Sequence, residues 1–245
     1  MDELLALLER YTPGYGDRIR GVKNWQLDDL EDVFGRPLPG FYREFALMMG
    51  QEGGSLLAHV KTYHPRADIT EIYEVAPPKE LPPRRFLFVF GDRSMDAHHF
   101  WLDLEAPTEE QDDCQVVRMP FGADAWRTSI SKVYISMREM LFVWAMRYVY
   151  LPRFPHHSDY LLLSWDKAPK SLRGAEDVVL LFERLGFNRL DYPRHCLLFE
   201  RDDASIMLYQ PIDGSGLSIK VGMRELTELR RFQAIIEDNT GMKKY

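Results

Sequence analysis

Apolar residues recur at helical spacing in three segments near the N-terminus. In the first segment, Leu4, Leu8 and Tyr11 lie at positions i, i+4 and i+7, and the Thr-Pro-Gly sequence that follows ends the run. Residues 25–34 and 41–49 repeat this pattern, and a glycine follows each of them. Each segment therefore predicts an amphipathic helix with one face toward a core.

After residue 54 the pattern changes to short runs that are typical of strands. Residues 86–90 (FLFVF) are continuously apolar and end at a Gly-Asp pair, which predicts a strand buried on both faces. The remaining predictions for this half are strands at 55–60, 97–104 and 114–119, an extended or short helical piece at 69–75, and a helix at 133–148.

A proline-containing segment, residues 152–158, has the composition of a linker, and the pattern restarts beyond it. The predicted order there is strand 160–165, helix 175–185, strands 196–199, 205–209 and 217–221, and helix 224–238. We therefore expect an α+β fold with two domains. Residues 1–151 would form helices packed on a mainly antiparallel sheet, and residues 158–245 would form a small βαβββα unit.

An ordered set of residues in the first half resembles the SUKH (SMI1/KNR4) superfamily. The residues that carry the resemblance are Leu30-Glu31, Phe34-Gly35, Leu38-Pro39, Tyr42, Phe45, Gly53-Gly54, the run 86–92, Phe100-Trp101 and Leu102-Asp103. Three features depart from the family pattern: Gly40 replaces a polar residue, Gln51-Glu52 stands where an Asn is usual, and no glycine follows Gly91 in its turn. The resemblance covers residues 1–150 and leaves residues 158–245 without a family.

Membership of this superfamily implies a fold and a way of acting, but no catalytic site. Bacterial SUKH proteins are often encoded beside polymorphic toxins and bind them directly, so the resemblance implies an immunity protein. The fungal members of the superfamily assemble other cellular proteins, which makes a regulatory or scaffold protein the alternative. The motif residues themselves have structural explanations, because Pro39 fixes a backbone angle ahead of a helix and the glycines allow chain reversals.

The negative charge of the chain is confined to its first half. The 245 residues have a formal net charge of -7. Residues 1–150 carry 17 Lys and Arg against 24 Asp and Glu, whereas residues 151–245 carry 14 of each kind. An acidic domain repels nucleic-acid phosphates, and its field speeds encounter with a basic protein. We therefore expect a protein partner, such as a basic toxin domain, and no nucleic acid.

The chain shows no signal for export or membrane insertion. Its N-terminus lacks a basic region followed by a long apolar run, and the apolar stretch at 137–151 is broken by three charged residues. Cys114 and Cys196, far apart in sequence, are expected to be free thiols. These features predict a soluble, cytoplasmic protein that does not bind membranes.

The residue types that carry catalysis or bind metals do not occur at useful spacings. The neighbouring pairs His98-His99 and His195-Cys196 would point to opposite faces of a strand. Ser215, between two glycines, lacks the context of a nucleophile elbow, and no metal-ligand or phosphate-binding motif occurs. The sequence thus predicts no enzyme, no metal and no cofactor.

An acidic run is the strongest functional candidate. It places six acids within eleven positions, without a Lys or Arg between them: Asp103, Glu105, Glu109, Glu110, Asp112 and Asp113. We expect an exposed loop that is either a partner-binding surface or simply a solvated turn. Asp92 and Asp96 would extend the surface, and Trp101 would be an aromatic anchor or a core residue.

Overall fold

The structure is a computed structural model, and it describes residues 1–92, 98–165, 168–169, 172 and 174–245. The chain divides into two compact units, Met1–Leu141 (unit 1) and Phe142–Tyr245 (unit 2). Both units combine helices with an antiparallel sheet, so the fold is mixed α+β.

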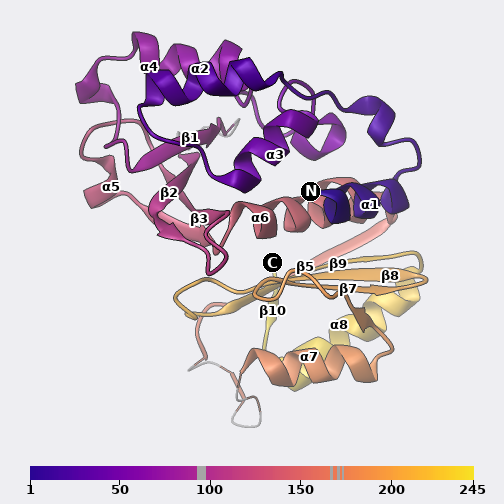
Figure 1. The fold of residues 1–245 in the computed structure, drawn as a ribbon. Helices are drawn as coiled ribbons and strands as arrows, with labels where there is room; N and C mark the ends of the chain where they lie inside the picture. The colour runs from indigo at the N-terminus through magenta and orange to yellow at the C-terminus, as the bar shows by residue number, and fades with distance from the viewer. Residues whose placement is uncertain (93–97, 166–167, 170–171, 173) are drawn as a thin grey trace. The chain divides into compact units, whose positions relative to one another are not determined.

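Unit 1 begins with the three helices that the spacing of apolar residues predicted. They are α1 (Asp2–Tyr11), α2 (Asn24–Phe34) and α3 (Gly40–Met49). A π-type turn (Pro65–Thr70) and the short helix α4 (Glu71–Val75) follow. Helices α2 and α4 lie side by side (Figure 1), where the rings of Phe34 and Tyr73 are 5.0 Å apart.

A four-stranded sheet of order β1-β2-β3-β4 completes unit 1. Its strands are β1 (Phe86–Phe90), β2 (His99–Pro107), β3 (Cys114–Met119) and β4 (Ser131–Tyr134), and α5 (Ala125–Thr128) lies between the last two. Helix α6 (Met137–Trp144) follows them and runs across the boundary between the two units. All five residues of β1 are buried, as the apolar run predicted. Phe45 of α3 packs edge-on against Phe90 of β1 at 5.5 Å, which places α3 against the sheet.

The residues that carry the SUKH resemblance have structural contacts in unit 1. The carboxylate of Glu31 accepts a hydrogen bond from the backbone N–H of Leu38 at 2.8 Å and pairs with Arg43 at 3.0 Å, so it joins α2 to α3. Gly35 ends α2 in the left-handed conformation, with a φ of 78°. These residues therefore stabilise the fold, which agrees with their structural interpretation.

The strand predicted at 55–60 is wrong, and the helix predicted at 133–148 starts later than expected. Residues 54–57 form a single 3-10 turn where a strand was expected at 55–60, and Val60 makes only an isolated bridge with Asp92. The helix expected at 133–148 begins at Met137, because Val133 and Tyr134 belong to β4, and Tyr134 pairs with Val116 of β3. Apolar spacing alone did not separate the last strand from the helix that follows it.

Unit 2 contains a six-stranded antiparallel sheet of order β10-β5-β9-β8-β7-β6. Its elements are β5 (His156–Leu162), α7 (Ala175–Arg184), β6 (Asn188–Arg189), β7 (Leu197–Arg201), β8 (Ala204–Tyr209), β9 (Leu217–Met223), α8 (Leu226–Thr240) and β10 (Lys243–Lys244). Helices α7 and α8 cover one face of this sheet (Figure 1), with Phe182 and Phe232 in the core between them. The two-residue strands β6 and β10 were not predicted.

The segment expected to be a linker is part of unit 2. Leu151–Arg153 form a 3-10 turn, and β5 starts at His156, which pairs with Met223 of β9. Because prolines mark strand and helix boundaries as well as linkers, composition misplaced this segment. Both cysteines are buried free thiols, as predicted. In the described parts of the chain, every helix is too short or too polar to cross a bilayer.

Candidate functional site

The acidic run does not form one exposed loop. Asp103 and Glu105 belong to β2, and the turn that follows leads to Asp113, immediately before β3. Asp103 and Asp113 are each only 2% exposed. Buried carboxylates require hydrogen-bond partners, so these two acids serve the fold. The expectation that all six acids form one exposed surface is therefore wrong, because two of them are buried.

Asp103 forms a two-pronged ion pair with Arg85, the residue before β1. The Nε and Nη2 groups of Arg85 donate to the two carboxylate oxygens at 2.6 and 2.7 Å. The same guanidinium lies 3.2 Å from the carboxylate of Glu105. The hydrogen bond to Asp103 raises the pKa of Arg85. Since Phe86 pairs with Asp103 in the sheet, this ion pair reinforces the β1–β2 register.

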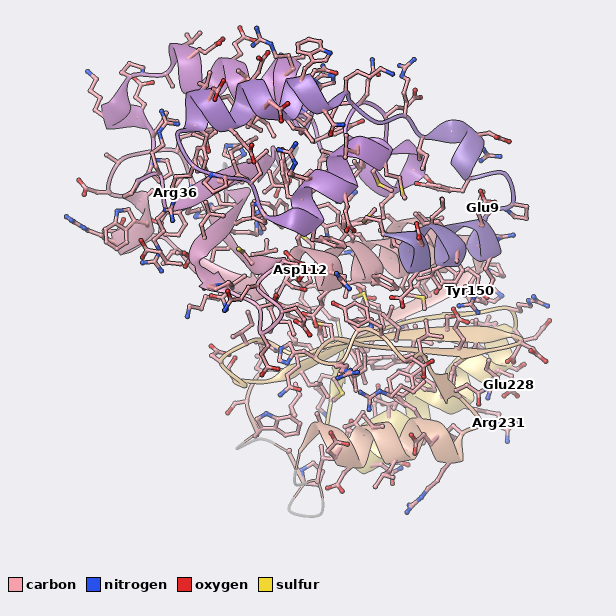
Figure 2. All side chains as sticks on the ribbon, in the orientation of Figure 1. Glu9, Arg36, Asp112, Tyr150, Glu228 and Arg231 are labelled. Carbon is pink, nitrogen blue, oxygen red and sulfur yellow. The ribbon has the colours of Figure 1, made fainter. Side chains whose placement is uncertain are left out.

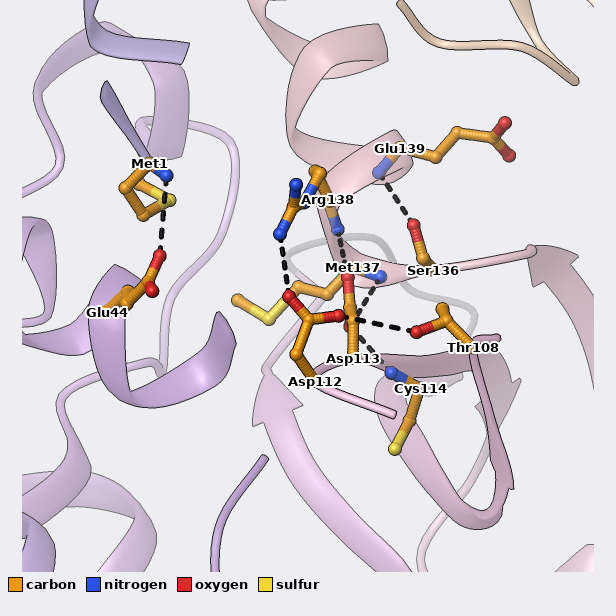
Figure 3. A network of polar contacts seen from close by, with 10 residues as sticks. All are labelled: Met1, Glu44, Thr108, Asp112, Asp113, Cys114, Ser136, Met137, Arg138 and Glu139. Atoms are coloured by element: carbon orange, nitrogen blue, oxygen red, sulfur yellow. Dashed lines mark hydrogen bonds and ion pairs between the residues drawn. The ribbon is translucent and has the colours of Figure 1, made fainter. Parts of the chain in front are cut away.

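Asp113 holds the first turn of α6 (Figure 3). Its carboxylate accepts hydrogen bonds from the backbone N–H groups of Met137 at 3.1 Å, Arg138 at 2.8 Å and Cys114 at 2.7 Å. Burial raises the pKa of Asp113 to about 6, although the three N–H donors act in the opposite direction. A carboxylate at this position satisfies N–H groups that the helix itself leaves without acceptors.

Asp112, labelled in Figure 2, connects the β2–β3 turn to two helices, and Figure 3 shows its ion pair with Arg138 of α6. Its carboxylate pairs with Arg138 of α6 at 2.8 Å and accepts a hydrogen bond from the Thr108 hydroxyl at 3.4 Å. Its backbone carbonyl accepts the N–H of Phe41, near the start of α3, at 2.8 Å. No local pattern predicts these contacts, because Phe41 and Arg138 are both distant from Asp112 along the chain.

The acids that remain exposed are Glu105, Glu109 and Glu110. Glu109 and Glu110 occupy the tip of the β2–β3 turn, which closes through a hydrogen bond from the Thr108 N–H to the Asp113 carbonyl at 2.8 Å. No ion pair of either glutamate occurs among the described residues. The most exposed part of the acidic run is thus its tip, which carries the carboxylates of Glu109 and Glu110.

The other predicted site residues lie elsewhere. Trp101 is completely buried and donates from Nε1 to the carbonyl of Met119 at 3.0 Å, so it is a core residue and not a surface anchor. Asp92 pairs with Arg118 at 2.6 Å, beside the opposite end of β2. Asp96 lies outside the described residues. The structure therefore does not gather the predicted site residues into one surface.

Candidate metal ligands are also dispersed. Within the described ranges, no group of three or more His, Cys, Asp or Glu side chains is placed to hold a metal ion. His99 packs against the rings of Phe88 and Phe121, at 5.8 and 4.8 Å, and its burial lowers its pKa. The imidazole therefore belongs to an aromatic cluster.

One surface feature was missed by the sequence analysis. Val75 and Phe121 are large apolar residues that remain exposed, and both line a groove beside α4. They are 46 positions apart, so no local pattern connects them. The local sign of such a site is Val75 itself, a large apolar residue that is exposed at the end of a short helix.

Comparisons with known proteins give no assignment. No family model, no curated protein and no solved structure matches this chain. The resemblance to the SUKH superfamily therefore stays a prediction that depends on the motif between Leu30 and Gly54.

Proposed function

We propose that the protein is a non-enzymatic binding protein, and that it neutralises a basic toxin domain as an immunity protein, by direct stoichiometric binding. One observation carries this proposal, namely the unequal charge of the two units. Residues 1–141 contain 16 Lys and Arg against 24 Asp and Glu, a formal net charge of -8. Residues 142–245 contain 15 against 14, a net charge of +1.

The charge of unit 1 suits a cationic partner. Toxins that attack nucleic acids need Lys and Arg to bind phosphates, and an inhibitor that covers such a site must offer negative charge. Glu109 and Glu110 supply two exposed carboxylates on one turn. The resemblance to the SUKH superfamily supports the same function. Encounter would be accelerated by the field of the whole unit and would slow as salt is added.

Co-expression with the product of the adjacent gene tests the proposal. We expect protection of growth and a purified complex whose stoichiometry is fixed. Titration separates binding from catalysis: a stoichiometric inhibitor protects in proportion to its molar amount, whereas an enzyme acts at a small fraction of it. Absence of a complex together with absence of protection would overturn the proposal. Recovery of complexes with ordinary cellular proteins, and none with a toxin, would instead favour the regulatory or scaffold function.

A further inference from the structure

A groove lies beside α4 in unit 1 and has a volume of about 520 Å³. Its apolar lining consists of Ile72, Val75, Ala76, Pro77 and Phe121. Val75 is 72% exposed and Phe121 is 39% exposed, values that leave two large apolar side chains in contact with water. We call this feature the α4 groove. An exposed apolar surface of this kind inside a polar rim is typical of a site for a partner.

Phe121 is held rigidly on its buried side. Its ring stacks on Phe88 at 5.4 Å with an interplanar angle of 18°, and it meets the edge of Trp101 at 5.2 Å. Phe88 and Trp101 are themselves in T-shaped contact at 5.0 Å. A partner side chain that covers Phe121 would therefore contact an aromatic surface that is already ordered, so little conformational entropy would be lost on this side.

The charged residues that line the groove are all acidic. Asp68, Glu71 and Glu80 line it, and none of the described lining residues is a Lys or Arg. Two bases occur in the same stretch of chain. Arg66 pairs with Asp29 at 3.2 Å and Glu74 at 3.7 Å, and Lys79 is exposed but does not line the groove.

We propose that the α4 groove binds a basic amphipathic segment of a partner protein. An aliphatic or aromatic side chain of this segment would cover Phe121 and Val75, and flanking Lys or Arg residues would meet Glu71 and Glu80. The combination of apolar and acidic lining residues favours this chemistry over an acidic or purely apolar segment. The inference rests on the proposed binding function, but it uses a different surface from Glu109 and Glu110.

The two surfaces lie at opposite ends of the β2–β3 ribbon. His99 pairs with Met119 at the groove end, and Pro107 pairs with Cys114 at the turn end. At about 3.3 Å per residue, the nine residues of β2 separate these ends by roughly 25 Å. Substitutions at one end therefore leave the other end unchanged, which allows matched variants to be compared.

The test is selection from a library of random 12-residue peptides displayed on phage, with the full-length protein as bait. We expect enrichment of peptides in which Lys or Arg flank a large apolar residue. A synthetic consensus peptide, measured by fluorescence anisotropy, should bind the double variant Glu71→Lys, Glu80→Lys about tenfold more weakly or worse, since two attractions become repulsions. Val75→Asp should also weaken binding, and added salt should weaken the binding of the wild-type protein.

The matched control is the double variant Glu109→Lys, Glu110→Lys, which changes the formal net charge by the same amount, from -7 to -3. It should bind the peptide within about twofold of the wild-type protein at moderate salt, because it lies far from the groove. Circular dichroism verifies that every variant is folded. Equal weakening by both double variants would overturn the inference, because only overall charge would then matter.

Three other outcomes would also test whether the α4 groove binds a basic segment. Enrichment of acidic or uncharged peptides, or no enrichment, would overturn the inference. A concentration-dependent dimer of the wild-type protein that Val75→Asp dissociates would assign the groove to a second copy of this chain. Failure of the inference is distinguishable from failure of the proposed function. If the double variant Glu71→Lys, Glu80→Lys and the variant Val75→Asp still form a toxin complex, the binding role of the α4 groove is contradicted and the proposed function is not.

Discussion

Acidic residues at the two ends of the β2–β3 ribbon are used in different ways. In β2 and the turn after it, Asp103, Asp112 and Asp113 are bonded to Arg85, Arg138 and the first turn of α6. At the groove end, by contrast, Glu71 and Glu80 are exposed beside apolar side chains. The denser acidic cluster in the sequence is thus mainly structural, and the sparser one lines a surface suited to binding.

This difference shows that a high local density of acidic residues in a sequence does not by itself indicate a binding surface. Six acids in eleven positions repel one another unless cations or backbone N–H groups approach them, and a folded chain can supply both. A carboxylate that folding brings to the N-terminus of a helix gains further from the helix dipole, as Asp113, 24 positions before Met137, does at α6. A dense acidic run is therefore as readily explained by capping and ion pairs with distant parts of the chain as by a binding loop.

The largest expected effect is on the free energy of unfolding, and it should differ between the buried and the exposed members of the aromatic cluster. Trp101→Ala should lower the free energy of unfolding by about 4 kcal/mol, because it leaves a cavity between Phe88 and β3. Phe121→Ala should lower it by only about 1 kcal/mol, since part of that ring already contacts water. Urea denaturation followed by circular dichroism measures both values.

A milder variant covers the case in which Trp101→Ala does not fold. Trp101→Phe keeps an aromatic ring but removes the Nε1–H that donates to Met119, and it should reduce stability by a smaller amount. If Trp101→Ala proved as stable as the wild-type protein and lost only partner binding, Trp101 would be a surface anchor after all.

Periodicity identified most of the helices and the buried strand of unit 1 because these elements bury one face or both. It could not place β4, whose Val133 and Tyr134 continue into an apolar helix without a break in pattern. It also misread residues 152–158, since prolines adjoin β5 there without forming a linker. Both errors have the same cause: strand pairing with distant residues overrides the local signal.

The candidate site was less predictable than the fold. The sequence located the acidic run, but not the roles of its members, which depend on Arg85 and Arg138, residues 18 and 26 positions away from their partners. Nor could it join Phe121 to Val75, because the groove exists only after β3 returns toward α4. Exposure and pairing are properties of the tertiary structure, and residue type alone does not contain them.

A second, smaller effect is the pH dependence of stability that the buried acid Asp113 contributes. The pKa of Asp113 rises from 3.8 to about 6 on folding. Between these values the folded protein holds more protons, so this contribution to stability is present below about pH 4 and is lost as the pH rises through 6. A shift of this size corresponds to about 3 kcal/mol. The Asp113→Asn variant, which carries no charge at this position, should lack this contribution to the pH dependence.

The measurement compares free energies of unfolding at pH 4.5 and pH 7 for three proteins. The wild-type protein should lose more stability than Asp113→Asn across this interval, because both share every other titrating group. Asp112→Asn removes a neighbouring charge that helps to raise the pKa of Asp113, so this variant should reduce the wild-type pH dependence without abolishing it. Parallel behaviour of wild-type and Asp113→Asn would mean that the folded protein does not protonate Asp113 in this range.

The smallest expected effect concerns the exposed tip of the same turn. The double variant Glu109→Ala, Glu110→Ala should change the free energy of unfolding by no more than about 0.5 kcal/mol, because the described structure gives neither side chain an ion-pair partner. The same variant should slow association with a basic toxin partner while leaving dissociation nearly unchanged, as expected for rim charges. Stopped-flow mixing at low and high salt separates the two rates. A loss of stability of about 2 kcal/mol or more would show that the tip, like the rest of the acidic run, supports the fold.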